Sequence, residues 1–135
     1  MRACRGGSKM LEINLPQALT ELTAAVEAYE HALLGNVIEA LNELFWDSPR
    51  TVRYGVRELL YGHEAIARFR RDRGPIDQRR TRRNTTITTF GSDFGTSNTE
   101  YLPLGSKRVG RQSQTWIRTE FGWKIVSAHV SFITD

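Results

Sequence analysis

The spacing of apolar residues changes near residue 75, and this change limits the fold more than any other feature of the chain. Before residue 75, apolar residues recur every three or four positions, as they do on the buried face of a helix. After it, segments rich in Thr, Val, Ile and aromatic residues alternate with a period of two, which is typical of strands. Helices followed by long strands predict an α+β fold in which the helices cover one face of an antiparallel sheet.

Three helices are predicted in the first half. The first begins at Asn14, a predicted N-cap with Gln17 in the capping-box position, and ends at Gly35. Its buried stripe is expected to be Leu15, Leu19, Leu22, Val26, Tyr29 and Leu33. Further helices are predicted over residues 37–46 and 63–71, and between them short extended segments at 51–54 and 58–61 flank Gly55.

Four long strands are predicted in the second half, over residues 81–90, 95–102, 108–119 and 123–133, in the order of a meander. A sheet that curls around helices forms a conical barrel whose open mouth can hold a small polar ligand. We expect a single domain over residues 14–135, preceded by a disordered extension over residues 1–13.

Composition and charge exclude several classes of protein. The chain has a net charge of +4, and the basic run Arg79–Arg83 raises the question of nucleic acid. Because no glycine-rich loop or aromatic stacking motif accompanies it, we predict no nucleic-acid partner. The run is interpreted as a solvated strand face, or alternatively as a partner for carboxylates of a second subunit. No apolar run reaches the length of a membrane span and no secretory signal is visible, so we expect a cytoplasmic protein with no membrane partner.

Metal and redox chemistry find little support in the sequence. Cys4 is the only cysteine, and no helical or hairpin spacing joins two histidines with a carboxylate. We therefore predict neither a metal site nor a cofactor.

Arg53 and Tyr29 are the predicted catalytic residues. Alternation on the short strand places Arg53 opposite Val52 and Tyr54, so that its guanidinium would face inward and bind a carboxylate. A salt bridge to Glu30 or Glu58 is the structural alternative. Tyr29 is the polar-tipped member of the first helical stripe, and with a cation such as Arg53 nearby it could serve as a general acid or base.

Arg70 and Arg73, three residues apart on the third predicted helix, are expected at the rim of the mouth. A solvated helix end is the alternative, and it is the favoured one for Arg73.

The last two strands supply the predicted polar wall. Gln112, Gln114 and Trp116 share one face of a strand, and the two amides suit a urea or amide group. We predict a turn of three to four residues that pairs Thr119 with Trp123, which sets Gln114 opposite Ala128 and Ser113 opposite His129. That register leaves His129 on the outer face, where an interface is favoured over catalysis, although a shift of one residue would reverse the assignment.

The chain resembles the AtzH-like group of the nuclear transport factor 2-like (SnoaL-like) superfamily through a series of short motifs in the same order. These are Tyr29-Glu30, Leu44-Phe45-Trp46, Val52-Arg53-Tyr54-Gly55, Tyr61-Gly62, Phe69-Arg70-Arg71-Asp72-Arg73, Thr88-Thr89-Phe90-Gly91-Ser92-Asp93-Phe94, Gly110-Arg111-Gln112-Ser113-Gln114-Thr115-Trp116 and Gly122-Trp123-Lys124-Ile125-Val126-Ser127-Ala128-His129-Val130-Ser131. The segment from Trp116 to His129 also looks like the association domain of calmodulin-dependent kinases, which favours the glutamine face as the pocket.

The resemblance implies a conical α+β barrel that forms homodimers through its sheet, with one pocket per subunit. It also implies that the motifs around Tyr29 and Arg53, with Tyr54, help to form that pocket. Members of the group are associated with the breakdown of oxalurate and carboxylated ureas alongside amidases. The expected function is therefore a metal-free amidohydrolase acting on a small carboxylated urea or amide. The alternative is a non-catalytic ligand-binding or accessory subunit of an amidase, because fold alone does not specify activity.

Overall fold

The structure of the chain is a computed structural model that describes residues 11–134. Its elements, in chain order, are α1 (Pro16–Leu34), α2 (Ile38–Glu43), β2 (Val52–Tyr54), β3 (Leu59–Tyr61), α3 (His63–Arg73), β4 (Arg80–Phe90), β5 (Phe94–Pro103), β6 (Gly110–Thr119) and β7 (Gly122–Phe132). Most of the predicted N-terminal extension lies outside the described residues. Its last residue, Ile13, forms an antiparallel bridge with Phe90, so pairing with the sheet begins one residue before the predicted boundary.

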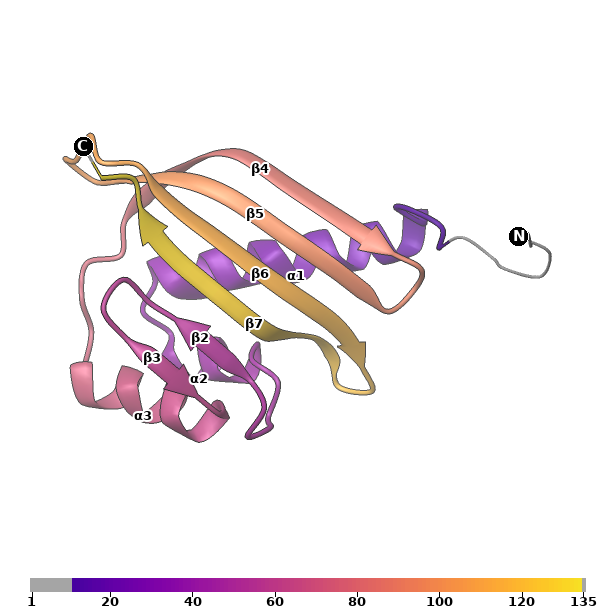
Figure 1. Ribbon diagram of the computed structural model, residues 1–135, viewed down its shortest axis with the longest axis horizontal. Helices are drawn as coiled ribbons and strands as arrows, with labels where there is room; N and C mark the ends of the chain where they lie inside the picture. The colour runs from indigo at the N-terminus through magenta and orange to yellow at the C-terminus, as the bar shows by residue number, and fades with distance from the viewer. Residues whose placement is uncertain (1–10, 135) are drawn as a thin grey trace.

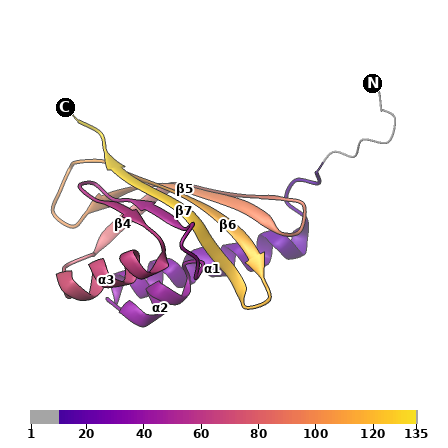
Figure 2. The same cartoon turned by 60° about the horizontal axis from the view of Figure 1, so that its bottom comes forward.

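The strands form one six-stranded sheet in the order β3-β2-β7-β6-β5-β4. The four long strands are the predicted antiparallel meander. The short strands β2 and β3 form a hairpin that joins the meander through a parallel pairing of β2 with β7. The sheet curves across α1, and all three helices lie on one side of it, which gives the α+β cone predicted from the change of period (Figures 1 and 2).

The buried face of α1 contains four residues of the predicted stripe and forms the core with the inner face of the sheet; the four are Leu22, Val26, Tyr29 and Leu33. The other two predicted members, Leu15 and Leu19, are only partly buried, and Ala18, Glu30 and Ala32 are buried in addition. Leu22 is fully buried and packs with Trp116 and Ile125 in one apolar cluster. Gly95 on β5 permits this close approach, because a Cβ there would overlap the Leu22 side chain.

The predicted N-cap of α1 is wrong. Asn14 has a φ of +59°, and its backbone N–H and side-chain Oδ1 bond the backbone of Thr89 at 3.0 and 2.9 Å. Leu15 occupies the capping position without a side-chain bond, and Gln17 donates to Glu21. Asparagine often caps a helix through its side chain, but Asn14 instead attaches the start of α1 to the end of β4.

The second helix is shorter than predicted. It ends at Glu43 because the chain then runs beside β7, where the Trp46 N–H donates to the Ile125 carbonyl and the Ile125 N–H donates to the Leu44 carbonyl. Phe45 is fully buried in this extended segment. The third helix is two residues longer than predicted and ends at Gly74, whose φ is +73°.

The hairpin between β6 and β7 combines a wrong prediction with a correct one. Thr119 pairs with Gly122, not with Trp123, and the loop has two residues. A bulge between Thr115 and Trp116 inserts one extra residue on β7, and beyond it Gln114 lies opposite Ala128 and Ser113 opposite His129, as predicted. The inner face is therefore Gln112, Gln114, Trp116 and Ala128, all buried.

Among residues 11–134, no helix is both long and apolar enough to cross a membrane. Within the same range, no three His, Cys, Asp or Glu side chains are grouped as ligands for a metal ion.

Candidate functional site

Arg53 on β2 and Arg70 on α3 lie near Tyr29 inside the cone, and Arg73 follows, partly exposed, at the end of α3. We call Arg53, Arg70 and Arg73 the open cluster, because they outnumber the carboxylates that face them. Tyr29 is 4% exposed. Its hydroxyl lies near Arg70 and raises the pKa of that arginine, against the effect of burial. The structure thus brings the predicted catalytic pair, Tyr29 and Arg53, into one group with Arg70.

Glu58 is the carboxylate that faces Arg53. Its Oε1 lies 3.5 Å from the Arg53 Nη1, an ion pair without a hydrogen bond, and that Nη1 is buried with no hydrogen-bond partner among the described residues. Gly55 makes the pair possible, because a Cβ at this position would overlap the Glu58 carboxylate. Of the two predicted structural partners for Arg53, Glu58 is therefore the one it meets.

Arg70 lies in the interior, not at the rim of the mouth as predicted. Arg70 is 3% exposed, and its Nη1 has no hydrogen-bond partner within residues 11–134. Its guanidinium stands 4.9 Å from the centre of the Phe45 ring. Burial lowers the pKa of Arg70, the Tyr29 oxygen opposes that shift, and the nearby charges of Arg53 and Arg73 add to it. Arg70 lies one helical turn after Ile66, on the same face of α3. Because Ile66 is buried, this face points inward and takes Arg70 with it.

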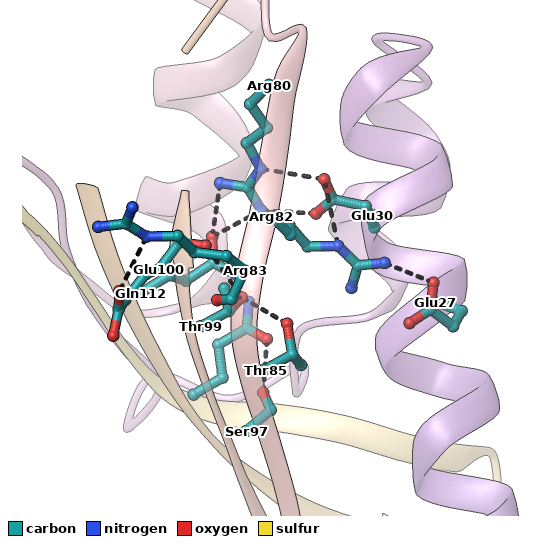
Figure 3. A network of polar contacts seen from close by, with 11 residues as sticks. Glu27, Glu30, Arg80, Arg82, Arg83, Thr85, Ser97, Thr99, Glu100 and Gln112 are labelled. Carbon is teal, nitrogen blue, oxygen red and sulfur yellow. Dashed lines mark hydrogen bonds and ion pairs between the residues drawn. The ribbon is translucent and has the colours of Figure 1, made fainter. Parts of the chain in front are cut away.

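A second arginine group is fully paired. We call Glu27, Glu30, Arg80 and Arg82 the paired cluster; it joins α1 to β4 (Figure 3). Arg80 donates to Glu30 through Nη2 at 2.6 Å and Nε at 3.1 Å, and both side chains are less than a tenth exposed. Arg82 donates to Glu27 at 2.7 Å and lies 3.7 Å from Glu30.

The paired cluster corrects part of the interpretation of the basic run. Within Arg79–Arg83, Arg79 pairs with Asp77 and Arg83 with Glu100, and both arginines are exposed, as a solvated face predicts. Arg80 and Arg82 are instead turned inward, where they meet carboxylates of the same chain. Alternation along β4 places Arg80 and Arg82 on the inner face.

The paired cluster is connected to the predicted polar wall. Arg80 donates to Gln112 Oε1 from both Nη1 and Nη2 at 3.3 Å, and its guanidinium lies 4.4 Å from the centre of the Tyr101 ring. Gly110 leaves the space that this ring occupies. Burial raises the pKa of Tyr101, with the charges of Arg80 and Arg53 opposing the shift. Tyr101 therefore lies between the two arginine clusters.

Gln114 is held by a different pair of side chains. The Trp116 Nε1 donates to Ser97 Oγ at 3.0 Å, and that hydroxyl donates to Gln114 Oε1 at 3.1 Å. Gln114 and Trp116 are 3% and 0% exposed. Both predicted glutamines thus face the interior with their oxygens engaged by protein donors.

Two predicted binding residues lie outside the cone. His129 is exposed on the outer face of β7, as the predicted register required, and its ring packs edge-on against Tyr54 at 5.6 Å between centroids. Tyr54 in turn packs against Tyr61, and a hydrogen bond between the two hydroxyls raises the pKa of Tyr61. Tyr54 and His129 thus lie on the face of the sheet opposite Arg53, as alternation predicted, and their part in ligand binding stays a prediction.

One surface hollow of the molecule lies away from the predicted site. It measures about 740 Å³ and is lined by Phe45, Trp46, His63, Phe121 and Lys124 among others. None of the predicted site residues lines it.

Sequence reasoning missed Arg80 and Tyr101. Alternation within the basic run was the available signal, because it separates Arg80 and Arg82 from Thr81 and Arg83. To predict that Tyr101 faces the interior, one would need to know that it pairs with Gly110 on the next strand. That pairing depends on the length of the loop between the strands, which is not evident from the sequence.

A curved sheet wrapped around one long helix is the arrangement of the nuclear transport factor 2-like and cystatin-like class of α+β folds. A protein of this superfamily from Salmonella enterica serovar Typhimurium superposes with a TM-score of 0.70 at 20% identity, covering 88% of this chain and 93% of its own.

The chain belongs to the AtzH-like family, whose sequence pattern matches residues 11–135. A protein of unknown function from Pectobacterium atrosepticum is 46% identical with a TM-score of 0.90, covering 93% of this chain and 100% of its own. A cystatin-like fold protein from Burkholderia xenovorans is also 46% identical, with a TM-score of 0.87 and coverages of 93% and 98%. No curated protein matches the chain.

Proposed function

We propose that the chain binds a small carboxylated urea or amide inside its cone and hydrolyses it without a metal ion. The observation that carries this proposal is the pair of buried Nη1 atoms of Arg53 and Arg70, which have no hydrogen-bond partner among the described residues. A buried guanidinium N–H without an acceptor is costly, and a ligand carboxylate would offset that cost with charge-assisted hydrogen bonds.

Charge within the open cluster supports an anionic ligand. Among the described residues, Arg53, Arg70 and Arg73 face one carboxylate, that of Glu58, whose Oε1 is 3.5 Å from the Arg53 Nη1. The paired cluster cannot supply a second one, because Glu30 is already engaged by Arg80 and Arg82.

The proposed roles follow from position. Arg53 and Arg70 anchor the carboxylate, and the Tyr29 hydroxyl, beside Arg70, transfers a proton at the reacting amide. Gln112 and Gln114 orient the urea or amide group. The family resemblance supports this assignment, since the motifs Tyr29-Glu30 and Val52-Arg53-Tyr54-Gly55 that carry it are both present.

The test mixes purified protein with N-carboxylated ureas and measures the release of carbon dioxide and ammonia. We expect turnover by the unmodified chain, loss of turnover in Tyr29→Phe with binding retained, and loss of both in Arg53→Ala. Arg68→Ala is the matched control, since Arg68 is an exposed arginine on the same helix as Arg70. Absence of turnover, together with unchanged ligand binding in Arg53→Ala, would refute the proposal.

A non-catalytic binding module is the second candidate, and the uncovered outer face of the sheet favours it. The helices lie on the other side (Figure 2), and Leu59 and Tyr61 on this face are 70% and 60% exposed. We propose that a second copy of the chain covers this face, as the family resemblance implies.

Stabilisation by small carboxylates without turnover, and capture of an amidase by the purified protein, would favour the accessory role. Dissociation of a dimer by Tyr61→Lys in analytical ultracentrifugation is expected.

A further inference from the structure

The interior residues of the proposed site are covered in this structure. Tyr29 and Arg70 are 4% and 3% exposed, and Gln112 and Gln114 are buried as well. A ligand of several atoms cannot reach a hydroxyl and a guanidinium that are covered to this extent. Some segment of the chain must therefore move before a ligand enters or leaves the cone.

The connector between α3 and β4, residues 74–79, joins the ends of the elements that carry the site. We call it the strap. Arg70 lies in the last turn of α3, Arg80 is the first residue of β4, and Tyr29 lies in the last two turns of α1. The strap passes beyond the C-terminal end of α1 on its way from α3 to β4 (Figures 1 and 2). It is therefore the segment that borders both arginine clusters.

The strap has little packing of its own. Residues 74–79 belong to no helix or strand, and none of them is buried. Its one aliphatic side chain besides Pro75, that of Ile76, is 42% exposed. Segments with few buried apolar contacts open locally at a low cost in free energy, without unfolding of the core.

One side chain holds the middle of the strap. Asn36, in the turn after α1, donates from Nδ2 to the Ile76 carbonyl at 2.8 Å and accepts from the Ile76 N–H through Oδ1 at 3.3 Å. Within residues 11–134, no other hydrogen bond joins residues 75–78 to a part of the chain outside the strap. Release of this single amide would free the middle of the strap.

The two ends of the strap differ in freedom. Gly74 has a φ of +73°, and a Cβ there would meet nothing within 4 Å, so this end is not packed. The ring of Pro75 fixes its own φ, and a change in the direction of the strap therefore falls on Gly74. At the other end, the Leu104 N–H donates to the Arg79 carbonyl at 3.0 Å.

The connector between β5 and β6, residues 104–109, is held more firmly. The Ile133 N–H donates to the Val109 carbonyl at 2.9 Å, and the Arg108 guanidinium lies 4.5 Å from the centre of the Phe132 ring. Both contacts attach it to the end of β7. The strap is thus the better candidate for the segment that moves.

We propose that the strap is the gate of the interior site, with Asn36 as its latch and Gly74 as its hinge. Loss of the two Asn36 hydrogen bonds lets the strap move outward and uncovers Arg70. The purpose of the gate rests on the proposed anion-binding function, whereas its opening is measured without a ligand.

Phenylglyoxal, an uncharged reagent that modifies accessible guanidinium groups, tests the opening. Peptide mapping of the full chain gives the rate of modification of Arg70 relative to that of Arg68, whose side chain is 53% exposed on the same helix. Asn36→Gly removes the latch without strain, because glycine readily adopts the φ of +54° found at this position. We expect the ratio to rise about threefold to tenfold, as the loss of these hydrogen bonds predicts.

Asn84→Gly is the matched control. Asn84 is also exposed and has a φ of +52°, but it lies within β4, where it bonds Glu100 at 3.1 Å. This substitution should leave the Arg70 ratio unchanged. Hydrogen exchange at the amides of β6 should be the same in wild type and in Asn36→Gly, because the gate opens without unfolding of the sheet.

An unchanged Arg70 ratio in Asn36→Gly overturns the gate. A rise accompanied by faster exchange in β6 also overturns it, since global unfolding would then expose Arg70. Oxamate, a small carboxylate with an amide group, separates the gate from the anion site, because it should slow the modification of Arg70 when bound. If the ratio rises as expected and oxamate gives no protection, the gate stands and the proposed anion site fails.

Discussion

The two arginine clusters inside the cone are built from the same side chain and differ in what faces it. In the paired cluster, Arg80 and Arg82 meet Glu27 and Glu30 in short hydrogen bonds between α1 and β4. In the open cluster, Arg53 has a longer ion pair, and Arg70 has an aromatic ring and a tyrosine hydroxyl beside it but no carboxylate partner within residues 11–134. The difference teaches that burial of an arginine does not by itself indicate a ligand site. A buried arginine indicates such a site when its guanidinium lacks a well-bonded carboxylate partner.

The comparison predicts opposite effects on stability, with the largest loss in the paired cluster. Arg80→Met leaves the Glu30 carboxylate buried without its main partner and should cost about 3 kcal/mol in the free energy of unfolding. The loss falls at the low end of the range for buried pairs because Arg82 remains 3.7 Å from Glu30. Urea denaturation measures it, with exposed Arg79→Met as the control. A loss below about 1 kcal/mol would remove the distinction between the clusters.

Arg70→Met should have the reverse sign. Removing a buried guanidinium without a carboxylate should raise the free energy of unfolding by about 1 kcal/mol, while the stabilising effect of small carboxylates is lost. The same denaturation experiment, with and without oxamate, measures both effects, and exposed Arg68→Met is the control. Destabilisation as large as that of Arg80→Met would show that Arg70 is structural.

Glu58→Gln should strengthen anion binding by the open cluster. The substitution removes the carboxylate that competes for Arg53, and should raise affinity for small carboxylates about threefold, a modest gain because Glu58 is partly exposed. Calorimetric titration measures the gain. Glu64→Gln, a change of the same kind in the exposed first turn of α3, should leave affinity unchanged.

The smallest effect is expected outside both clusters. Hydrogen bonds from Arg79 hold the pKa of the Asp77 carboxyl at about 2, below its unfolded value of about 3.9. A depressed folded pKa stabilises above the unfolded pKa, and this contribution is lost as pH falls from about 4 toward 2. Asp77→Asn should remove that small acid dependence and leave anion binding intact. An NMR titration that finds an ordinary carboxyl pKa would contradict the pairing.

Much of the fold could be predicted because it depends on local pattern. The change of period, the buried stripe of α1 and the four-stranded meander needed only side-chain spacing. The errors occurred where backbone pairing overrode local preference. Asn14 bonds Thr89 and does not cap the helix, and residues after Glu43 leave the helical register to pair with Ile125.

The candidate site was predicted in part for the same reason. Tyr29, Arg53, Gln112 and Gln114 lie inside the cone because their positions follow from helical or strand periodicity. Tyr54 and His129 lie outside it, and Arg70 is interior where a rim was expected. The register of β7 was predicted correctly only because a bulge compensates for a shorter turn.

The sequence by itself determined the order of helices and strands, the family, and which residue types could meet a carboxylate. Tertiary structure alone decided which arginines are paired. Arg80 bonds Glu30 across 50 residues of chain, whereas Arg70 is packed against Phe45 and Tyr29 and forms no ion pair with any acid of the described part of the chain. Local spacing sets the face on which a side chain lies. The charge that it meets depends on how distant segments pack, and that is what separates a structural ion pair from an anion-binding site.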